Sequence, residues 1–332
     1  MRKPWMAGVL AGLLLLGACG DPSSGPESAA PVPSAPRASS TTHQRPAATP
    51  GTDTGTGTGT GTGTEAEPNT EPSTGASTAA GAPAQRTRPT VLYLGDSLAM
   101  ENQKVLGGLM RDELKARYTS APYSGTTLCD YLEGTGKDSL VPPKDKAAAL
   151  VRTLRPDFVV LQFWGNAWGY TPCMDGITHG KAQSKYFARY TADARRLTDQ
   201  IAGAAGGARP KVVWVLQGPD PMTPDRVRRV NAIYERQAAA SGDLLADAGK
   251  AVSPASARYT WSQYLPCTAY EREHPAYCTQ PSNGRTALHI DDDYLHFCLV
   301  PTTTTPRPCP VRSPGILRIT RAITRAVASQ LD

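Results

Sequence analysis

Two short stretches of this chain hold the residue types that nucleophilic chemistry needs. The first, Gly-Asp-Ser-Leu at 95–98, follows directly on an apolar run and contributes Ser97. The second, Asp-Asp-Asp-Tyr-Leu-His at 291–296, places Asp293 three residues before His296. One turn of chain would then put a carboxylate beside the imidazole and leave the other ring nitrogen to face a serine. A serine activated in this way could attack an acyl carbon and form a covalent intermediate.

The alternation of apolar runs and amphipathic stretches predicts the elements that position this serine. Short apolar runs indicate strands, and helical spacing of apolar residues indicates the segments that connect them. We expect a first strand at 90–94, a second strand that ends at 122–125, and further strands at 157–163, 211–216 and 244–246. We expect helices at 98–118, 144–154, 182–202, 224–240 and 312–331. A long irregular stretch is expected at 259–310. Strands that alternate with helices predict a parallel sheet covered on both faces, a three-layer α/β/α sandwich of the α/β class.

Within that sandwich, Ser97 is predicted at the carboxyl end of the first strand and at the start of the following helix. Open α/β sheets bind ligands outside the carboxyl ends of their strands. A helix N-terminus also favours negative charge that develops during a reaction. The position therefore suits a nucleophile, provided that a base and donors for an oxyanion lie nearby.

Four short blocks, in order along the chain, resemble those of the SGNH hydrolases, also called the GDSL esterase family. They are Gly95-Asp96-Ser97-Leu98, Gly125 within Tyr-Ser-Gly-Thr, Gly165-Asn166, and Asp293-Tyr294-Leu295-His296. The resemblance covers about residue 91 to the C-terminus and implies a flavodoxin-like fold with a five-stranded parallel sheet. It also implies ester hydrolysis without a metal or a cofactor.

The resemblance further implies a role for each matched residue. Ser97 would be the nucleophile, His296 the general base, and Asp293 the group that orients the imidazole. The backbone N–H groups of Ser97 and Gly125 and the side-chain amide of Asn166 would form the oxyanion hole. Two positions depart from the family pattern, because Ala167 replaces the aspartate that usually follows the asparagine, and Tyr294 replaces the glycine that often follows the last aspartate.

Two alternatives compete with the triad. In one, the Asp run is a solvated turn, with Asp291 and Asp292 at the surface, and His296 is a loop residue whose hydrogen bonds are satisfied. In the other, His289, Asp293 and His296 form a metal site. We favour the triad because the other blocks stand in the expected order. His43, His179, His274 and His289 have no motif context.

The N-terminal part of the chain predicts export and lipidation. Residues 1–18 have the basic start and short apolar segment of a secretory signal. Leu-Gly-Ala-Cys at 16–19 resembles a bacterial lipobox with Cys19 as the lipidated residue, the alternative being an ordinary signal with a chance cysteine. Residues 19–88 are rich in Ser, Thr, Pro and Gly and predict a disordered tether. We therefore expect a hydrolase domain at 89–332, lipid-anchored at the extracytoplasmic face of a bacterial cell membrane.

The remaining six cysteines, an even number behind an export signal, predict three disulfides. Fifteen pairings are possible. Cys267 with Cys278 and Cys298 with Cys309 are the simplest local pairs, which would leave Cys129 for Cys173. A zinc site is the alternative, but the chain contains no close Cys-x-x-Cys pair.

Charge and composition narrow the class of partner. The net charge is +6 without a block of Lys or Arg, which argues against nucleic-acid binding. Aromatic residues near Asn166 (Trp164, Trp168 and Tyr170) and in the late stretch (Trp261, Tyr264, Tyr270 and Tyr277) could wall a pocket for a sugar or an acyl chain. We expect a monomeric esterase for short acyl groups, acetyl groups on surface carbohydrate being favoured. An O-acyltransferase with the same triad and a non-catalytic envelope-binding lipoprotein are the alternatives.

Overall fold

The computed structural model describes residues 88–135, 139–255, 257–302 and 307–331. The predicted signal, Cys19 and nearly all of the predicted tether lie outside these ranges. The described residues belong to one unit, Ala79–Asp332. No helix among them is long and apolar enough to cross a membrane.

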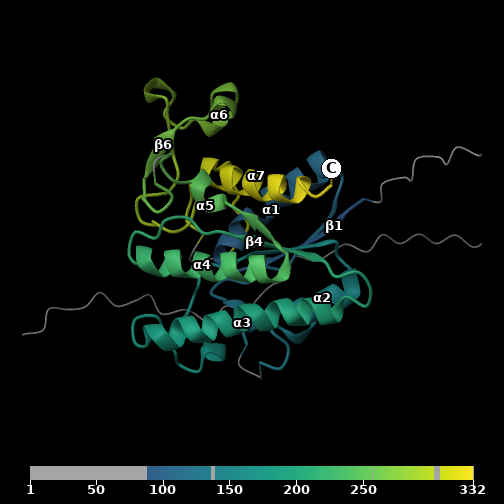
Figure 1. Cartoon of the computed structure of the whole chain (residues 1–332). Helices are drawn as coiled ribbons and strands as arrows, with labels where there is room; N and C mark the ends of the chain where they lie inside the picture. The colour runs from purple at the N-terminus through teal and green to yellow at the C-terminus, as the bar shows by residue number, and fades with distance from the viewer. Residues whose placement is uncertain (1–87, 136–138, 256, 303–306, 332) are drawn as a thin grey trace, which may run out of the picture. The chain divides into compact units, whose positions relative to one another are not determined.

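A five-stranded sheet forms the middle layer (Figure 1), and its strand order is β2-β1-β3-β4-β5. All its neighbouring strands pair in parallel. The strands are β1 (Thr90–Gly95), β2 (Arg117–Ser120), β3 (Phe158–Gln162), β4 (Lys211–Val215) and β5 (Leu244–Ala246). The predicted α/β class and the three-layer sandwich are therefore confirmed.

Side chains of the central strands alternate between two apolar cores, as the two-residue period of a strand requires. In β1, Leu92 and Leu94 face one core, and Val91 and Tyr93 face the other. The first core is covered by the helices α2 (Ala147–Leu154), α3 (Gln183–Ala204) and α4 (Pro224–Ser241). The second core is covered mainly by α1 (Ser97–Leu114) and α7 (Pro314–Ala328), with α5 (Ala248–Ala251) beside them (Figure 1).

Two details differ from the sequence predictions. The first helix ends at Leu114 and not near 118, because Lys115 adopts a left-handed φ of 55° and its N–H donates to the Met110 carbonyl. The next residues form β2 at the sheet edge, so the second strand ends before Pro122, and 122–125 is a loop. Apolar residues at helical spacing extend to Tyr118, beyond the end of α1, because the Tyr118 ring packs directly against Gly107 of that helix. An added Cβ at Gly107 would lie 2.7 Å from the ring.

The long late stretch is not wholly irregular. It contains a small antiparallel sheet of β6 (Tyr264–Pro266) and β7 (Arg285–Ala287), together with the short helix α6 (Ala269–Glu273). The part that carries Asp293 and His296 has no regular strand or helix, and only an isolated bridge joins Ile290 to Asp293. The position of His296 must therefore be set by local hydrogen bonds and cross-links.

Candidate active site

Ser97 lies at the sharp turn from β1 into α1, which is possible because Gly95 has no side chain. An added Cβ at Gly95 would lie 2.1 Å from the Gln162 carbonyl oxygen of β3 and 2.5 Å from the Ala99 Cβ. Asp96 caps the helix, since its Oδ1 accepts a hydrogen bond from the Leu98 N–H at 3.1 Å. Ser97 is consequently the first residue of α1, at the carboxyl edge of the sheet.

His296 reaches this serine across 199 positions of sequence. Its Nε2 lies 2.9 Å from the Ser97 Oγ. Its Nδ1 lies 3.0 Å from Oδ1 and 2.9 Å from Oδ2 of Asp293. A carboxylate only accepts hydrogen bonds, so Nδ1 carries the hydrogen and the neutral ring leaves Nε2 free to accept the serine proton. The three residues that the sequence singled out are brought together in the order that acyl-transfer chemistry uses.

The Asp293 carboxylate is itself held by the chain that it shares with His296. Its Oδ1 accepts the backbone N–H groups of Leu295, at 3.2 Å, and of His296, at 3.1 Å. The side chains of His296 and Asp293 are only 15% and 14% exposed. This local turn fixes the carboxylate beside the ring without a strand or helix.

Electrostatics favour a protonated imidazole at this position. Burial alone would lower the pKa of His296, but the hydrogen bond to Asp293 and the negative charges of Glu101, Asp293 and Asp96 raise it above its ordinary value. Burial alone would raise the pKa of Asp293, but its bonds and charge interaction with His296 lower it. The arrangement thus stabilises the imidazolium that forms when the ring takes a proton.

Two backbone N–H groups, those of Ser97 and Gly125, belong to residues that line the cleft beside the Ser97 hydroxyl. Among the described residues, neither the Ser97 N–H nor the Gly125 N–H donates to a protein acceptor. Both residues line one cleft of about 200 Å³, together with Asn166 and His296. The Gly125 loop follows β2 and is tied to β1 by Tyr131, whose hydroxyl donates to the Gly95 carbonyl oxygen at 2.8 Å.

The Asn166 amide is fixed more tightly than the sequence suggested. Gly165, at a φ of 88°, turns the chain after β3 and presents Asn166 to the cleft. The indole N–H of Trp168 donates to Oδ1 at 3.1 Å, and an indole N–H can only donate. The Nδ2 group therefore faces Thr126 O at 3.1 Å and Asp96 Oδ2 at 3.3 Å. Both amide hydrogens have protein acceptors, so an oxyanion must share or replace one of these bonds.

Asp96 is a site residue to which the sequence assigned no role of its own. Besides capping α1, its Oδ2 accepts the Trp164 N–H at 2.7 Å and the Asn166 amide. Burial raises the pKa of Asp96 to about 6, although the hydrogen bonds from Trp164 and Leu98 act in the opposite direction. Its place inside the Gly-Asp-Ser motif was the one signal available, because its partners lie about 70 residues away.

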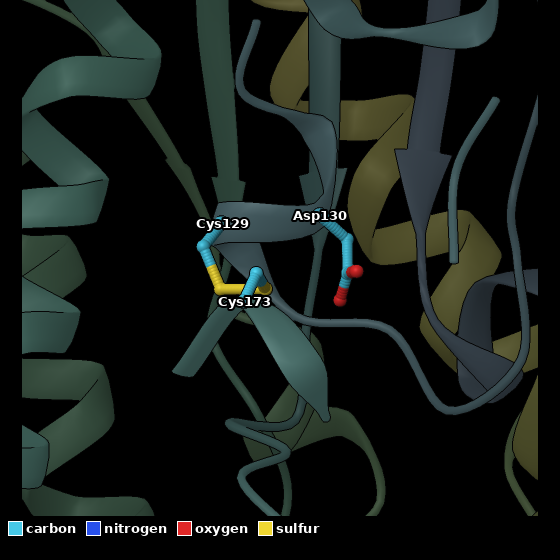
Figure 2. Close-up of side chains that lie close together, drawn as sticks. All are labelled: Cys129, Asp130 and Cys173. Carbon is cyan, nitrogen blue, oxygen red and sulfur yellow. A yellow bond between two sulfur atoms is a disulfide. The ribbon is translucent and has the colours of Figure 1, made fainter. Parts of the chain in front are cut away.

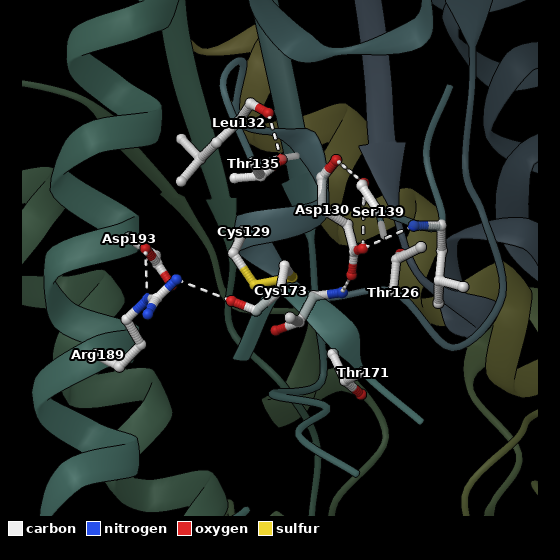
Figure 3. Close-up of a disulfide and its surroundings, with 12 residues drawn as sticks. Thr126, Cys129, Asp130, Leu132, Thr135, Ser139, Thr171, Cys173, Arg189 and Asp193 are labelled. Atoms are coloured by element: carbon white, nitrogen blue, oxygen red, sulfur yellow. Dashed lines mark hydrogen bonds and ion pairs between the residues drawn. A yellow bond between two sulfur atoms is a disulfide. The ribbon is translucent and has the colours of Figure 1, made fainter. Parts of the chain in front are cut away.

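A disulfide between Cys129 and Cys173 joins the loop that carries Gly125 to the loop that carries Asn166 (Figure 3). Cys129 lies four residues after Gly125, and Cys173 lies seven residues after Asn166. Cys129 and Cys173, with Asp130, form the one candidate metal cluster in the described ranges (Figure 2). The two sulfur atoms are bonded to each other, so neither is a thiolate that could bind a metal.

The other two disulfides stabilise the late stretch. They join Cys267 to Cys278 and Cys298 to Cys309. The structure therefore contains the three pairs that the simplest reading of the sequence favoured. Cys298 lies two residues after His296, so the last pair constrains the chain directly beside the imidazole.

The alternative metal site from His289, Asp293 and His296 does not assemble in the described part of the chain. His289 Nδ1 lies 2.9 Å from the His296 carbonyl oxygen. Both ring nitrogens of His296 are already paired, with Ser97 and Asp293. His289 instead supports the loop from behind, where burial lowers its pKa.

Aromatic residues line part of the cleft, as the sequence predicted for the group near Asn166. Trp164, Trp168 and Tyr170 line it, and Arg307 adds a cation. Tyr170 is 55% exposed, and its ring lies beside Gly125. The aromatic residues predicted in the late stretch (Trp261, Tyr264, Tyr270 and Tyr277) are not among the residues that line this cleft.

Comparisons with known proteins give only distant likenesses. No family model and no curated protein matches the chain. Among solved structures, it is similar to a protein assigned to the lipolytic G-D-S-L family from Desulfitobacterium hafniense DCB-2, at 9% identity and a TM-score of 0.42, over 72% of this chain and 99% of that one.

Two further solved structures have similarly low scores. The Clostridium thermocellum family 3 carbohydrate esterase matches at 12% identity and a TM-score of 0.38, over 74% of this chain and 98% of that one. The periplasmic domain of a lipopolysaccharide acetyltransferase from Salmonella ser. Paratyphi A matches at 9% identity and 0.43, over 73% and 84%. Likeness at this level does not decide an activity, so the case for a function rests on the geometry of the cleft.

Proposed function

We propose that this protein is a serine esterase that hydrolyses short acyl esters, with Ser97 as the nucleophile. The observation that carries the proposal is the continuous contact from Ser97 Oγ through the His296 ring to the Asp293 carboxylate. Ser97 and His296 line a cleft that is open to a substrate, and Asp293 lies behind the imidazole, in contact with Nδ1. A binding protein without catalysis would have no need of this chain of contacts.

In the proposed reaction, Ser97 Oγ attacks the ester carbonyl while His296 Nε2 takes the hydroxyl proton. The oxyanion is stabilised by the N–H groups of Ser97 and Gly125, and by the Asn166 amide once one of its hydrogens turns toward it. The imidazolium then protonates the leaving alcohol as the carbon–oxygen bond breaks. Water attacks the acyl-serine, with His296 again as the base, which releases the carboxylic acid and restores Ser97.

The substrate that we favour is an acetyl or other short acyl ester of a carbohydrate. A cleft of about 200 Å³ has room for a small acyl group. The indole ring of Trp168 and the exposed phenol of Tyr170 offer flat apolar surfaces with polar edges, which suit a sugar ring. The lipobox-like Cys19 and the tether at 19–88 would place such an enzyme at the outer face of the membrane, close to envelope glycans.

A series of p-nitrophenyl esters from acetyl to long acyl chains tests this proposal. We expect turnover that falls steeply beyond the shortest chains. A long-chain preference would exclude the short-acyl substrate class. Transfer of the acyl group to an added sugar, with little release of acid, would favour the O-acyltransferase. Ligand binding without turnover in folded, oxidised protein would contradict an enzyme altogether.

A further inference from the structure

A second buried carboxylate, Glu101, lies on the same side of α1 as Ser97. The two residues are four positions apart, one turn of helix, so their side chains are neighbours. The Glu101 residue is only 2% exposed, yet it lines the same cleft as Ser97 and His296. It forms no ion pair within the ranges that the structure describes. A buried carboxylate with no cationic partner is costly, which suggests that it has a specific role.

The contacts of Glu101 all lie on the segment that follows His296. Its Oε2 accepts the Phe297 backbone N–H at 3.0 Å. Its Oε1 accepts the Thr302 hydroxyl at 2.6 Å. Its own carbonyl oxygen accepts the Cys309 N–H at 3.2 Å. One residue of the nucleophile helix thus holds three points of the chain that carries the base, including the residue directly after His296.

The remaining charged groups around the imidazole are few. Asp293 faces its Nδ1, Asp96 lies at the turn before Ser97, His289 lies behind the loop, and Arg307 lines the same cleft. Asp96 is buried, which raises its pKa, although the hydrogen bonds from Trp164 and Leu98 favour its charged form. Arg307 is exposed to solvent. Burial raises the pKa of Glu101, whereas the charge of His296 and the bonds from Thr302 and Phe297 lower it. The two groups therefore interact electrostatically.

We propose that Glu101 is a positioning residue that acts through His296. Its carboxylate fixes the distance between the base-carrying segment and the nucleophile helix, and its charge supplements Asp293 in stabilising the imidazolium. The expected effect of Glu101 on kcat/KM rests on the proposed esterase function. Its expected effect on the pKa of His296 does not. Two carboxylates then serve one imidazole, Asp293 through a direct hydrogen bond and Glu101 through its charge and its hold on the backbone.

The test measures the imidazole of His296 directly, by NMR titration of the full-length protein with labelled histidine. Glu101→Gln keeps the size of the side chain and an acceptor for Phe297 but removes the charge. Glu113→Gln, at an exposed position near the end of the same helix, is the matched control for charge loss. Thr302→Val removes one hydrogen bond and keeps the charge.

We expect Glu101→Gln to lower the pKa of His296 by about half a pH unit or more, because a nearby negative charge that favoured the protonated ring is gone. The acid limb of kcat/KM should move by the same amount. Glu113→Gln should move neither, and Thr302→Val should give a smaller change than Glu101→Gln. An unchanged His296 pKa in folded Glu101→Gln would overturn the proposal, as would an equal change in Glu113→Gln.

Two further outcomes are distinguishable. If Glu101→Gln does not fold, the wild-type protein still decides the matter, because the Glu101 carboxyl and the His296 ring should titrate as a coupled pair. Independent titration would overturn the proposal. If wild-type protein turns over no ester, the esterase function fails, while the NMR titration still reports whether Glu101 acts on His296.

Discussion

The two halves of the candidate site are built by different means. The nucleophile half, with Ser97, Gly125 and Asn166, lies at the carboxyl edge of the central sheet, where β1, β2 and β3 end. The base half, with Asp293 and His296, belongs to a stretch without regular structure. Strand register sets the first half, whereas turn hydrogen bonds, a disulfide and contacts with α1 set the second half.

This difference predicts unequal tolerance of perturbation. The sheet edge is held by ladders between strands that are far apart in sequence, and by the close approach of Gly95 to Gln162. Losing one support there leaves several others. The base half has no such ladder, and its supports are single hydrogen bonds and a disulfide, such as the bonds of Glu101 to Phe297 and Thr302. Loops that lack a hydrogen-bonded ladder open more readily than sheet strands do.

The largest expected effect comes from removing a reacting group from either half. Ser97→Ala and His296→Ala should each lower kcat by about 10⁴-fold or more, because the covalent route is lost in both. The double variant should be no worse than either single variant, because the two residues act as one unit. Kinetics with p-nitrophenyl acetate, on protein whose fold is verified by circular dichroism, measure this. Additive losses would show that the halves work separately.

A smaller effect is expected within the nucleophile half. Asn166→Ala should lower kcat by about a hundredfold, the usual consequence of losing one oxyanion donor, with KM little changed. The structure adds a condition, because both amide hydrogens of Asn166 are bonded to Asp96 and Thr126 at rest. If Asn166→Ala turns over at the wild-type rate, the amide only supports the turn, and the backbone N–H groups of Ser97 and Gly125 form the oxyanion hole alone.

The sequence predicted the central strands of the sheet and the edge strand β5 better than the edge strand β2. Buried strands such as β1 and β3 are continuous apolar runs, because both faces of the sheet are covered. The edge strand β2, Arg-Tyr-Thr-Ser, is half-buried and has no such run, so its position was wrong. The helix before it ends through a left-handed lysine, and a lysine carries none of the signal that a glycine would give.

For the site itself, motifs located the reacting groups but not their supports. Ser97, Asp293 and His296 were identified because their local spacing is informative, and the structure places them in contact. Glu101 could not be identified in that way, because its partner Thr302 stands 201 positions later in the chain. The hydrogen bonds that orient Asn166 likewise depend on how β1 and β3 are paired.

Removing the disulfide of each half tests the contrast directly. Replacing Cys129 and Cys173 by serine should lower the free energy of unfolding by about 4 kcal/mol, and replacing Cys298 and Cys309 by about 3 kcal/mol, because the first pair closes the longer loop. We expect the opposite order for kcat. Loss of Cys298–Cys309 should lower kcat by roughly tenfold, because small displacements of a catalytic group are costly. Loss of Cys129–Cys173 should lower kcat by less.

Denaturant unfolding and ester kinetics on the same samples measure both quantities. The wild-type protein under reducing conditions serves as the control for loss of all three cross-links. If the loss of Cys129–Cys173 lowers kcat more than the loss of Cys298–Cys309 does, the sheet does not hold the oxyanion loops by itself. The disulfide would then be their main support.

The smallest expected effect is a divergence between stability and activity with pH, which arises from His296 and Asp293 of the base half. The pKa of His296 is raised on folding, so its stabilising contribution is fully present below the unfolded value of about 6.5 and is lost as pH rises through the folded pKa. The pKa of Asp293 is lowered, so its contribution is lost as pH falls through the folded value.

Catalysis instead needs the neutral ring of His296, so kcat/KM should rise over the pH range in which the stabilisation from the protonated ring disappears. The difference in unfolding free energy between wild type and His296→Gln, measured at several pH values, should therefore shrink as activity grows. A constant difference would mean that the imidazole is no better stabilised in the fold than in the unfolded chain.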